Sequence, residues 1–259
     1  SGKSTLAQLL AQQTGLTKNA YDEKLEDGES PQAVRAELAA APLQCDPGTC
    51  HTYQNVAFDA ASEILAQATK RPFADSVSER FFLPLGMKSA SYGMSGLTGA
   101  KDWARPHNGS QVRTLKETYW RVPAAAGVES NIVDFARWLQ ATMGERPDVL
   151  PASVLKVAQM PRVKTARLYG GALRQANSDA HYGLGWRSFK YGGHDLIGHS
   201  GAVDGYRTSL IFDPATRTGV VAMWNSNWGA PFRIPFAVFD AYDKRTDSRW
   251  LDLSDITPA

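Results

Sequence analysis

The sequence predicts an α/β protein of the α+β type, in which a mostly helical region precedes an antiparallel sheet. Over residues 1–181, apolar residues recur mainly at helical spacing. From residue 182 the period becomes that of strands, and an apolar, amphipathic stretch at 231–245 predicts a closing helix. We therefore divide the chain into a helical region, 1–181, and a sheet region, 182–259, that ends in the closing helix.

Helices are predicted in the first region from apolar spacing and from residues that begin or end a helix. Leu6 and Leu9 share a face after Ser4 or Thr5, which are plausible N-caps. Ser130-Asn131 caps a helix with the acidic Asp134 near its first turn. Residues 91–128 are Gly-rich and irregular, which predicts a long surface excursion. The other predicted helices cover residues 55–69, 73–82 and 151–160.

Strands are predicted in the second region from four apolar or alternating runs. The turn Asp213-Pro214-Ala215-Thr216-Arg217-Thr218-Gly219 joins the last two as a hairpin. The four runs are YGLGWRSF (182–189), DLIGHS (195–200), YRTSLIFD (206–213) and GVVAMWNSN (219–227).

The composition is that of a soluble globular protein, with 43% hydrophobic and 21% charged residues. A net charge of +2 and the absence of a larger basic cluster argue against a nucleic-acid partner. No apolar run approaches the ~20 residues that a membrane-spanning helix needs. We therefore expect no nucleic acid and no membrane span.

Cys45 and Cys50 flank the turn Asp46-Pro47-Gly48-Thr49. This turn could bring their Cα atoms within the reach of a disulfide. A bridge over so short a loop would mainly rigidify the approach to Tyr53, and it would imply a periplasmic or secreted protein. The alternative is two free thiols in a reducing compartment.

Three patterns imitate functional sites. Ser153-Val154-Leu155-Lys156 has the letters Ser-x-x-Lys but follows Tyr53 in a short helix. Residues 1–5, SGKST, imitate the end of a phosphate-binding loop without its upstream glycine and strand. The five histidines show no paired metal spacing, with His194 and Asp195 the least implausible start of a zinc site. We expect no metal and no cofactor.

Five short segments, followed by His199-Ser200-Gly201, carry the most specific information. They are TLAQLLAQQTGL, PGTCHTYQNVAFDAASEIL, FFLPLGMKSASY, AAAGVESNIVDFARWL and YGLGW. In this order they resemble the class C-like branch of the serine β-lactamase and penicillin-binding family, which also holds D-alanyl-D-alanine peptidases and esterases. The resemblance runs over nearly the whole chain. It implies a β-lactamase/transpeptidase-like fold, with an antiparallel sheet flanked by helices and a helical subdomain.

The resemblance also implies catalytic roles. Tyr53 would be the base or proton relay between a serine and the leaving nitrogen, and neighbouring cations would have to lower its phenol pKa from about 10. Asn55 would hydrogen-bond the amide side chain of the substrate. His199 takes the place of a lysine, so we expect an imidazole whose charge changes between about pH 5 and 8 and which binds a carboxylate in its charged form. The backbone N–H of Ala202 would form half of the oxyanion hole.

Three further residues complete the expected substrate site. Ser200 would offer its hydroxyl to a substrate carboxylate, and Gly201 would leave room for substrate beside the strand. Tyr206, on the sheet, is a candidate for the cleft wall.

The predicted function is acyl-enzyme hydrolysis of β-lactam amide bonds. The histidine in place of lysine weakens the anchor for a β-lactam carboxylate, so a D-alanyl-D-alanine peptidase or an esterase is the alternative. The partner would be a small molecule: a β-lactam, an acyl-D-amino-acid peptide or an ester. No Ser-x-x-Lys precedes Tyr53 in these 259 residues, so the N-terminal nucleophile segment of the family is absent. A non-catalytic remnant of the fold is therefore the alternative of another class.

Overall fold

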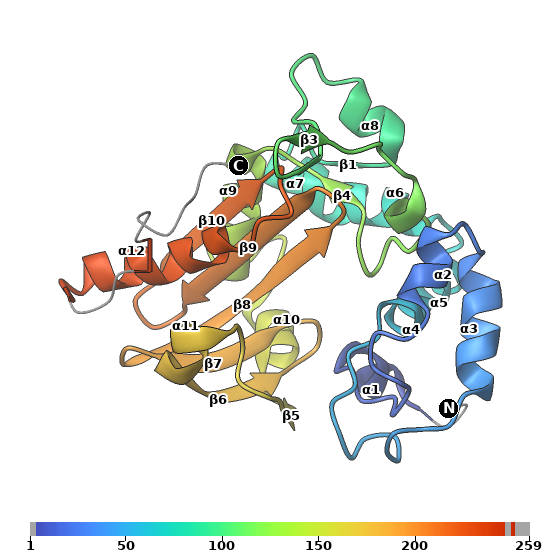
Figure 1. Ribbon diagram of the computed structural model, residues 1–259, viewed down its shortest axis with the longest axis horizontal. Coiled ribbons are helices and arrows are strands. Elements are labelled where there is room, and N and C mark those ends of the chain that lie inside the picture. Colours follow the sequence, from blue (N-terminus) through green and yellow to red (C-terminus); the bar gives the residue numbers. More distant parts are fainter. Residues whose placement is uncertain (1–3, 247–249, 252–259) are drawn as a thin grey trace.

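A six-stranded antiparallel sheet forms the centre of the protein in a computed structural model, which describes residues 4–246 and 250–251 (Figure 1). The strands lie in the order β10-β9-β8-β7-β6-β5, so each strand pairs with its neighbour in sequence. This up-and-down order needs only short connections. The strands are β5 (Val163–Lys164), β6 (Asn177–Tyr182), β7 (Arg187–Tyr191), β8 (His194–Val203), β9 (Tyr206–Asp213) and β10 (Thr218–Trp224).

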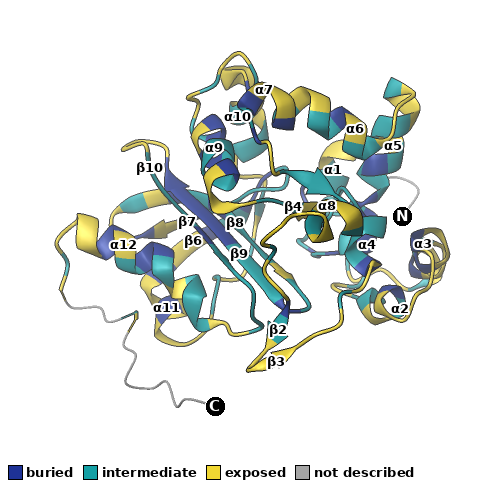
Figure 2. Ribbon diagram, turned by 90° about the horizontal axis from the view of Figure 1, so that it is seen from above, coloured by how far each residue is buried: buried dark blue, intermediate teal, exposed yellow. Residues whose placement is uncertain are grey.

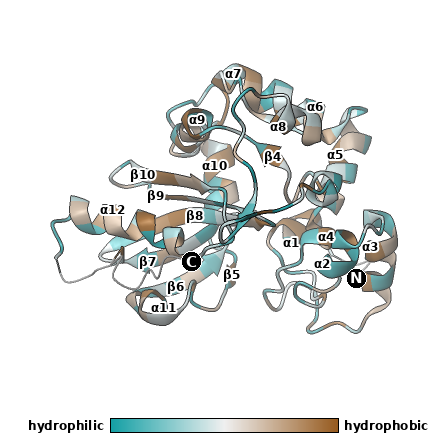
Figure 3. Cartoon of the chain, turned by 45° about the horizontal axis from the view of Figure 1, so that its top comes forward, coloured by the Kyte–Doolittle hydropathy of each residue, from teal (hydrophilic) through white to brown (hydrophobic). Residues whose placement is uncertain are grey.

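Helices cover both faces of the sheet. Helix α12 (Ile234–Tyr242) buries Phe236 and Phe239 against Leu196 and Ile211 on one face. Helix α9 (Ile132–Thr142) packs Leu139 against neighbouring residues of β9 that point the opposite way. Figure 2 shows the resulting burial of the central strands, and Figure 3 shows β9 and β10 as largely hydrophobic. These two contacts fix the sheet in the fold class that the sequence predicts.

Helices α1 to α5 lie to one side of the sheet in Figure 1 and α6 to α8 lie above it, while α10 and α11 lie beside β6 and β7. One group of helices surrounds the Tyr53 segment and a second group runs along residues 73–98. The 91–128 excursion holds only short elements, as predicted. The first group is α1 (Leu6–Leu10), α2 (Asp22–Glu26), α3 (Pro31–Ala40), α4 (Asn55–Phe58) and α5 (Ala60–Thr69). The second is α6 (Phe73–Val77), the π-helical η1 (Ser78–Phe82), α7 (Leu83–Leu85) and α8 (Met94–Thr98). The remaining elements are β1 (Ser91–Tyr92), β2 (His107–Asn108), β3 (Gln111–Val112), η2 (Thr118–Arg121), β4 (Val128–Glu129), α10 (Ala152–Gln159), α11 (Gly171–Ala176) and η3 (Ala230–Arg233).

The structure adds elements that the sequence analysis did not predict. Strands β5 and β6 both begin before residue 182, so the sheet starts earlier than the change of period indicates. Strand β6 reads NSDAHY, with residues disfavoured in strands and a register shift between Ser178 and His181. Helix α3 begins at Pro31 and is capped by Ser30, whose side chain accepts a hydrogen bond from Ala33 N. The division of the chain into two regions stays a prediction.

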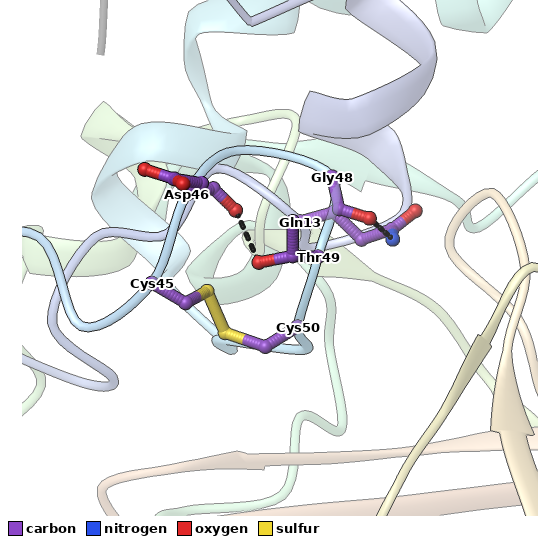
Figure 4. The surroundings of a disulfide bond; sticks show 6 residues. All are labelled: Gln13, Cys45, Asp46, Gly48, Thr49 and Cys50. Atoms are coloured by element: carbon purple, nitrogen blue, oxygen red, sulfur yellow. Dashed lines mark hydrogen bonds between the residues drawn. A yellow bond between two sulfur atoms is a disulfide. The ribbon is translucent and has the colours of Figure 1, made fainter.

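Cys45 and Cys50 form a disulfide with Cα atoms 6.3 Å apart, as the turn between them predicts (Figure 4). The loop is pinned to the segment after α1, because Gln13 Nε2 donates to Gly48 O at 2.9 Å and Gly48 N donates to Gln13 O at 2.8 Å. Gly15 lies so close that a Cβ there would come 2.1 Å from Cys45 O. The bridged loop is therefore part of the scaffold that leads to Tyr53.

Candidate active site

Tyr53 and Asn55 flank a residue that holds their segment in place. Gln54 is fully buried and extended, with φ −149° and ψ 108°, so its neighbours project to the opposite side. Its side chain donates to Thr17 O at 3.2 Å and to Ala20 O at 2.9 Å, and accepts from Val56 N as the N-cap of α4. The Tyr-x-Asn spacing therefore follows from one extended residue at a helix start.

The second half of the site is a free strand edge. Strand β8 continues five residues past its last pair with β7, Gly198 with Arg187, so residues 199–203 pair only with β9. Val203 and Tyr206 flank a two-residue turn, which makes them a hydrogen-bonded pair. The alternation of the ladder then directs the backbone N–H of Ser200 and Ala202 away from β9. Ala202 N–H thus lies on the open edge, where an oxyanion hole requires a donor.

His199 joins the two halves. Its ring lies 6.2 Å from the ring of Tyr53, centroid to centroid, with an interplanar angle of 28°. Its Nδ1 lies 2.8 Å from Ser200 O and its Nε2 lies 3.1 Å from the hydroxyl of Tyr182. A carbonyl oxygen only accepts, so Nδ1 carries a proton. In a neutral ring Nε2 then accepts from the Tyr182 hydroxyl, which gives the imidazole one tautomer.

The expectation that His199 changes charge between about pH 5 and 8 is wrong for this structure. Burial lowers the pKa of His199 to about 4, and the nearby Arg187 guanidinium lowers it further, while the Ser200 carbonyl opposes both. The imidazole is therefore neutral near pH 7. His199 cannot replace the permanent charge of a lysine.

The cation of the site is Arg187, which the sequence analysis missed. Its guanidinium carbon lies 5.4 Å from the ring centroid of Tyr53 and 5.1 Å from that of Tyr182. Such distances are typical of cation–π contacts. In the described part of the chain, Arg187 has no salt bridge. The only sequence signal was its place after Gly-Leu-Gly-Trp, where β7 begins.

His51 and Tyr182 complete an aromatic cluster around Tyr53. The His51 ring lies 5.2 Å from that of Tyr182, and burial lowers the pKa of His51 to about 4. Burial raises the pKa of Tyr53 above its ordinary value, although Arg187 opposes this rise. Within this chain Tyr53 is therefore a neutral phenol, and one arginine does not produce the acidification that the resemblance implies.

The predicted substrate-binding residues Ser200, Gly201 and Tyr206 make contacts within the protein itself. Ser200 Oγ lies 3.5 Å from Ser209 Oγ, on the face of β8 opposite to His199. A Cβ at Gly201 would come 2.7 Å from Thr208 Oγ1, so this glycine relieves a contact within the sheet. Tyr206 donates to Ala104 O at 2.7 Å and so anchors the 91–128 excursion. The roles in substrate binding stay predictions.

The imitations of functional sites have structural explanations where the chain is described. Ser153 and Lys156 are exposed on α10. His194 contacts Asp213 and Asp243, while Asp195 pairs with Lys190. Among residues 4–246 and 250–251, no three His, Cys, Asp or Glu side chains are grouped to hold a metal ion. Most of the SGKST segment lies outside the described residues. No helix in the described ranges has the length and hydropathy to span a bilayer.

The chain belongs to the beta-lactamase family, whose model matches residues 1–238. It is 24% identical over 253 residues to the unguisins hydrolase ungD' of Aspergillus campestris, covering 94% of this chain and 46% of the relative. It is 29% identical over 188 residues to a D-aminopeptidase of Brucella anthropi, covering 71% and 33%. The chain thus spans about half the length, or less, of these curated relatives.

Solved structures show the same fold. The octameric penicillin-binding protein homologue from Pyrococcus abyssi matches with a TM-score of 0.80 at 19% identity, over 94% of this chain and 56% of that one. A class C beta-lactamase mutant matches with a TM-score of 0.70 at 17% identity, over 92% and 70%. A D-amino acid amidase from Ochrobactrum anthropi SV3, complexed with L-phenylalanine amide, matches with a TM-score of 0.70 at 19% identity, over 93% and 72%. The fold prediction is confirmed.

Proposed function

We propose that this chain supplies the Tyr53 half-site and the strand edge of a serine hydrolase that cleaves amide bonds next to D-amino acids. The observation that carries the proposal is the stacking of Tyr53 on His199 at the free edge of β8. The D-aminopeptidase among the relatives supports the choice of substrate. β-Lactam hydrolysis remains a prediction; with His199 neutral, a β-lactam carboxylate would have to bind Arg187 in place of the residue at the lysine position.

The chemistry is acyl transfer in two steps. A serine oxygen, which we place on a segment outside these 259 residues, attacks the amide carbon, and Ala202 N–H stabilises the oxygen that becomes negative. Because Tyr53 is a neutral phenol, it acts as a proton relay: its hydroxyl gives its own proton to the leaving nitrogen as it accepts the serine proton, and the C–N bond breaks. Water then attacks the acyl-enzyme and gives a proton to the Tyr53 oxygen as the Tyr53 hydroxyl proton passes to the serine oxygen, and the acid is released.

The test uses the intact protein that carries this chain and three chromogenic substrates. These are the p-nitroanilides of D-alanine and L-alanine and a chromogenic cephalosporin. We expect kcat/KM for the D-anilide to exceed that for the L-anilide by roughly tenfold or more. Turnover of the cephalosporin alone would establish a β-lactamase, and no turnover of any substrate would favour a non-catalytic remnant.

The same proposal places the protein outside the cytoplasm, in the periplasm or secreted. The Cys45–Cys50 bridge supports this location, because disulfides persist in oxidising compartments.

A further inference from the structure

Gln12 adopts a backbone conformation that glutamine rarely takes. It follows α1 with a left-handed φ of 57°, and only 3% of its surface is exposed. Glycine or asparagine is usual just after a helix, because a Cβ is unfavourable at such a φ. Strained residues of other kinds persist where their surroundings over-determine them, and they gather at functional sites. The contacts that Gln12 makes therefore have to offset its strain.

Gln12 holds the backbone on both sides of Tyr53. Its carbonyl oxygen accepts from Thr52 N at 2.8 Å, and its side-chain Oε1 accepts from Gln54 N at 2.8 Å. Because a backbone N–H only donates, the Gln12 amide must present its oxygen to Gln54. Tyr53 therefore lies between two peptide groups that one buried residue fixes.

The nitrogen end of the same amide faces the second half of the site. Burial raises the pKa of the Tyr182 phenol, and a hydrogen bond from the Gln12 side chain is among the contacts that lower it. Since Oε1 is engaged with Gln54, Nε2 is the atom of Gln12 that donates to the Tyr182 oxygen. The Tyr182 hydroxyl in turn lies 3.1 Å from His199 Nε2. Gln12 thus connects the Tyr53 segment with His199.

These contacts form a chain that can point in only one direction. A phenol has one proton to donate and Gln12 Nε2 accepts none, so the Tyr182 proton is directed at His199 Nε2. The imidazole proton then lies on Nδ1, which is 2.8 Å from Ser200 O on β8. Hydrogen bonds that point the same way along a chain strengthen one another. A change at Gln12 should therefore be felt at His199 and Ser200.

We propose that Gln12 is a positioning residue that couples the Tyr53 segment to the open edge of β8. The inference rests on the proposed amide hydrolysis and assigns part of its rate to a buried side chain. Tyr53 must relay protons where Ala202 N–H stabilises the negative oxygen, and a misplacement of about 1 Å can cost about 10²-fold in rate. Loss of the Gln12 amide should therefore lower kcat more than it raises KM.

The kinetic test uses Gln12→Asn in the intact protein that carries this chain, with D-alanine p-nitroanilide as substrate. Asparagine tolerates the left-handed φ, but its side chain is one methylene too short to reach both Gln54 and Tyr182. We expect kcat to fall by roughly 10- to 100-fold while KM changes by less than about threefold. The matched control is Gln13→Asn, which should leave kcat unchanged because Gln13 binds Gly48 O in the disulfide loop. A Gln12→Asn protein that is less stable in urea but turns over normally would reduce Gln12 to a structural residue.

A spectroscopic test needs no turnover. Gln12→Glu keeps an acceptor for Gln54 N but replaces the donor to Tyr182 by a carboxylate oxygen, to which the Tyr182 hydroxyl can turn. His199 Nε2 is then free to take a proton. The pKa of His199, followed by nitrogen NMR of the imidazole, should rise from about 4 by roughly one unit or more. His199→Gln identifies the signal, and the control Gln13→Glu should leave it in place.

The two tests keep this inference apart from the proposed function. A shifted His199 titration in a protein that turns over no substrate would establish the coupling and disprove the reaction. A His199 titration that Gln12→Glu leaves unchanged would overturn the chain, whether or not the protein is active. Circular dichroism checks the fold of each variant. If Gln12→Asn is unfolded, Gln12→Glu, which keeps the contact with Gln54, takes its place in the kinetic test.

Discussion

Among single residues, Arg187 influences the pKa values of several neighbours in the site. Its guanidinium stacks on Tyr53 and Tyr182, and it acts in the same direction on both nearby histidines by lowering their pKa. A single positive charge therefore adds to the effect of burial on the His199 pKa and opposes the rise in the Tyr53 pKa. The site combines a permanent cation, a neutral imidazole and a neutral phenol.

Removing this charge should change the titration of its neighbours. In Arg187→Gln we expect the pKa of His199 to rise from about 4 but to stay below 6.5, because burial is the larger cause. The pKa of Tyr53 should also rise. The imidazole is followed by NMR and the phenolate by ultraviolet absorbance, each against a variant that lacks the residue. Arg187→Lys keeps the charge and should resemble wild type. Unchanged titration of both groups in Arg187→Gln would remove the electrostatic role.

The Tyr53 segment shows how elements position the site. Gln54 joins the residues after α1, the approach to α2 and the start of α4, and Gln12 Oε1 accepts from Gln54 N at 2.8 Å. These contacts lie behind Tyr53 and Asn55, so the site depends on a side chain that faces the interior.

Replacing Gln54 by leucine should therefore destabilise the protein strongly. The change leaves Thr17 O, Ala20 O and Val56 N without their side-chain partner, and unpaired buried polar groups cost about 1–3 kcal/mol each before relaxation. We expect a loss of roughly 2–4 kcal/mol in the free energy of unfolding, measured by urea denaturation. Gln54→Glu keeps the acceptor and the shape but loses the donor. A Gln54→Leu protein as stable as wild type would show that these hydrogen bonds contribute little.

The sequence predicted the elements whose signals are local. The Tyr-x-Asn segment, the helix capped by Asn131 and strand β9 each carry their pattern within about ten residues. Arg187, His51 and Tyr182 carried no comparable signal, because the fold brings them to Tyr53 from other segments. The charge of His199 was predicted wrongly, since its pKa depends on burial and on Arg187.

At the scale of the whole molecule, the histidines should give the protein a stability maximum near neutral pH. His51 and His199 have folded pKa values of about 4 against an ordinary value of 6.5. Between these values the unfolded chain binds protons that the folded protein does not, so stability falls as pH falls through this range. His199 contributes on the order of 2–3 kcal/mol to this loss, and His51 contributes less, because solvent screens its more exposed ring. His51→Leu should reduce the acid-side slope.

On the alkaline side, the fall in stability comes from His194, which connects α12 to the sheet. Its Nδ1 lies 2.6 Å from Asp213 Oδ2 at the end of β9, and its Nε2 lies 2.8 Å from Asp243 Oδ2 just after α12. Burial alone would lower its pKa, but the two carboxylates outweigh burial and raise the pKa above 6.5. Arg245 also binds Asp243 at 2.7 Å and competes for that carboxylate without abolishing the effect.

The raised pKa of His194 determines how the free energy of unfolding changes as pH rises. A raised pKa stabilises the folded protein fully below about pH 6.5, and the contribution is lost as pH rises through the folded pKa. We expect the free energy of unfolding, measured with urea from about pH 6 to pH 9, to fall with rising pH in wild type. His194→Gln can still hydrogen-bond but cannot titrate, so its stability should be lower below pH 6.5 and nearly flat above it. A wild-type profile that rises across this range, or one that His194→Gln leaves unchanged, would show that His194 is not held as a cation between Asp213 and Asp243.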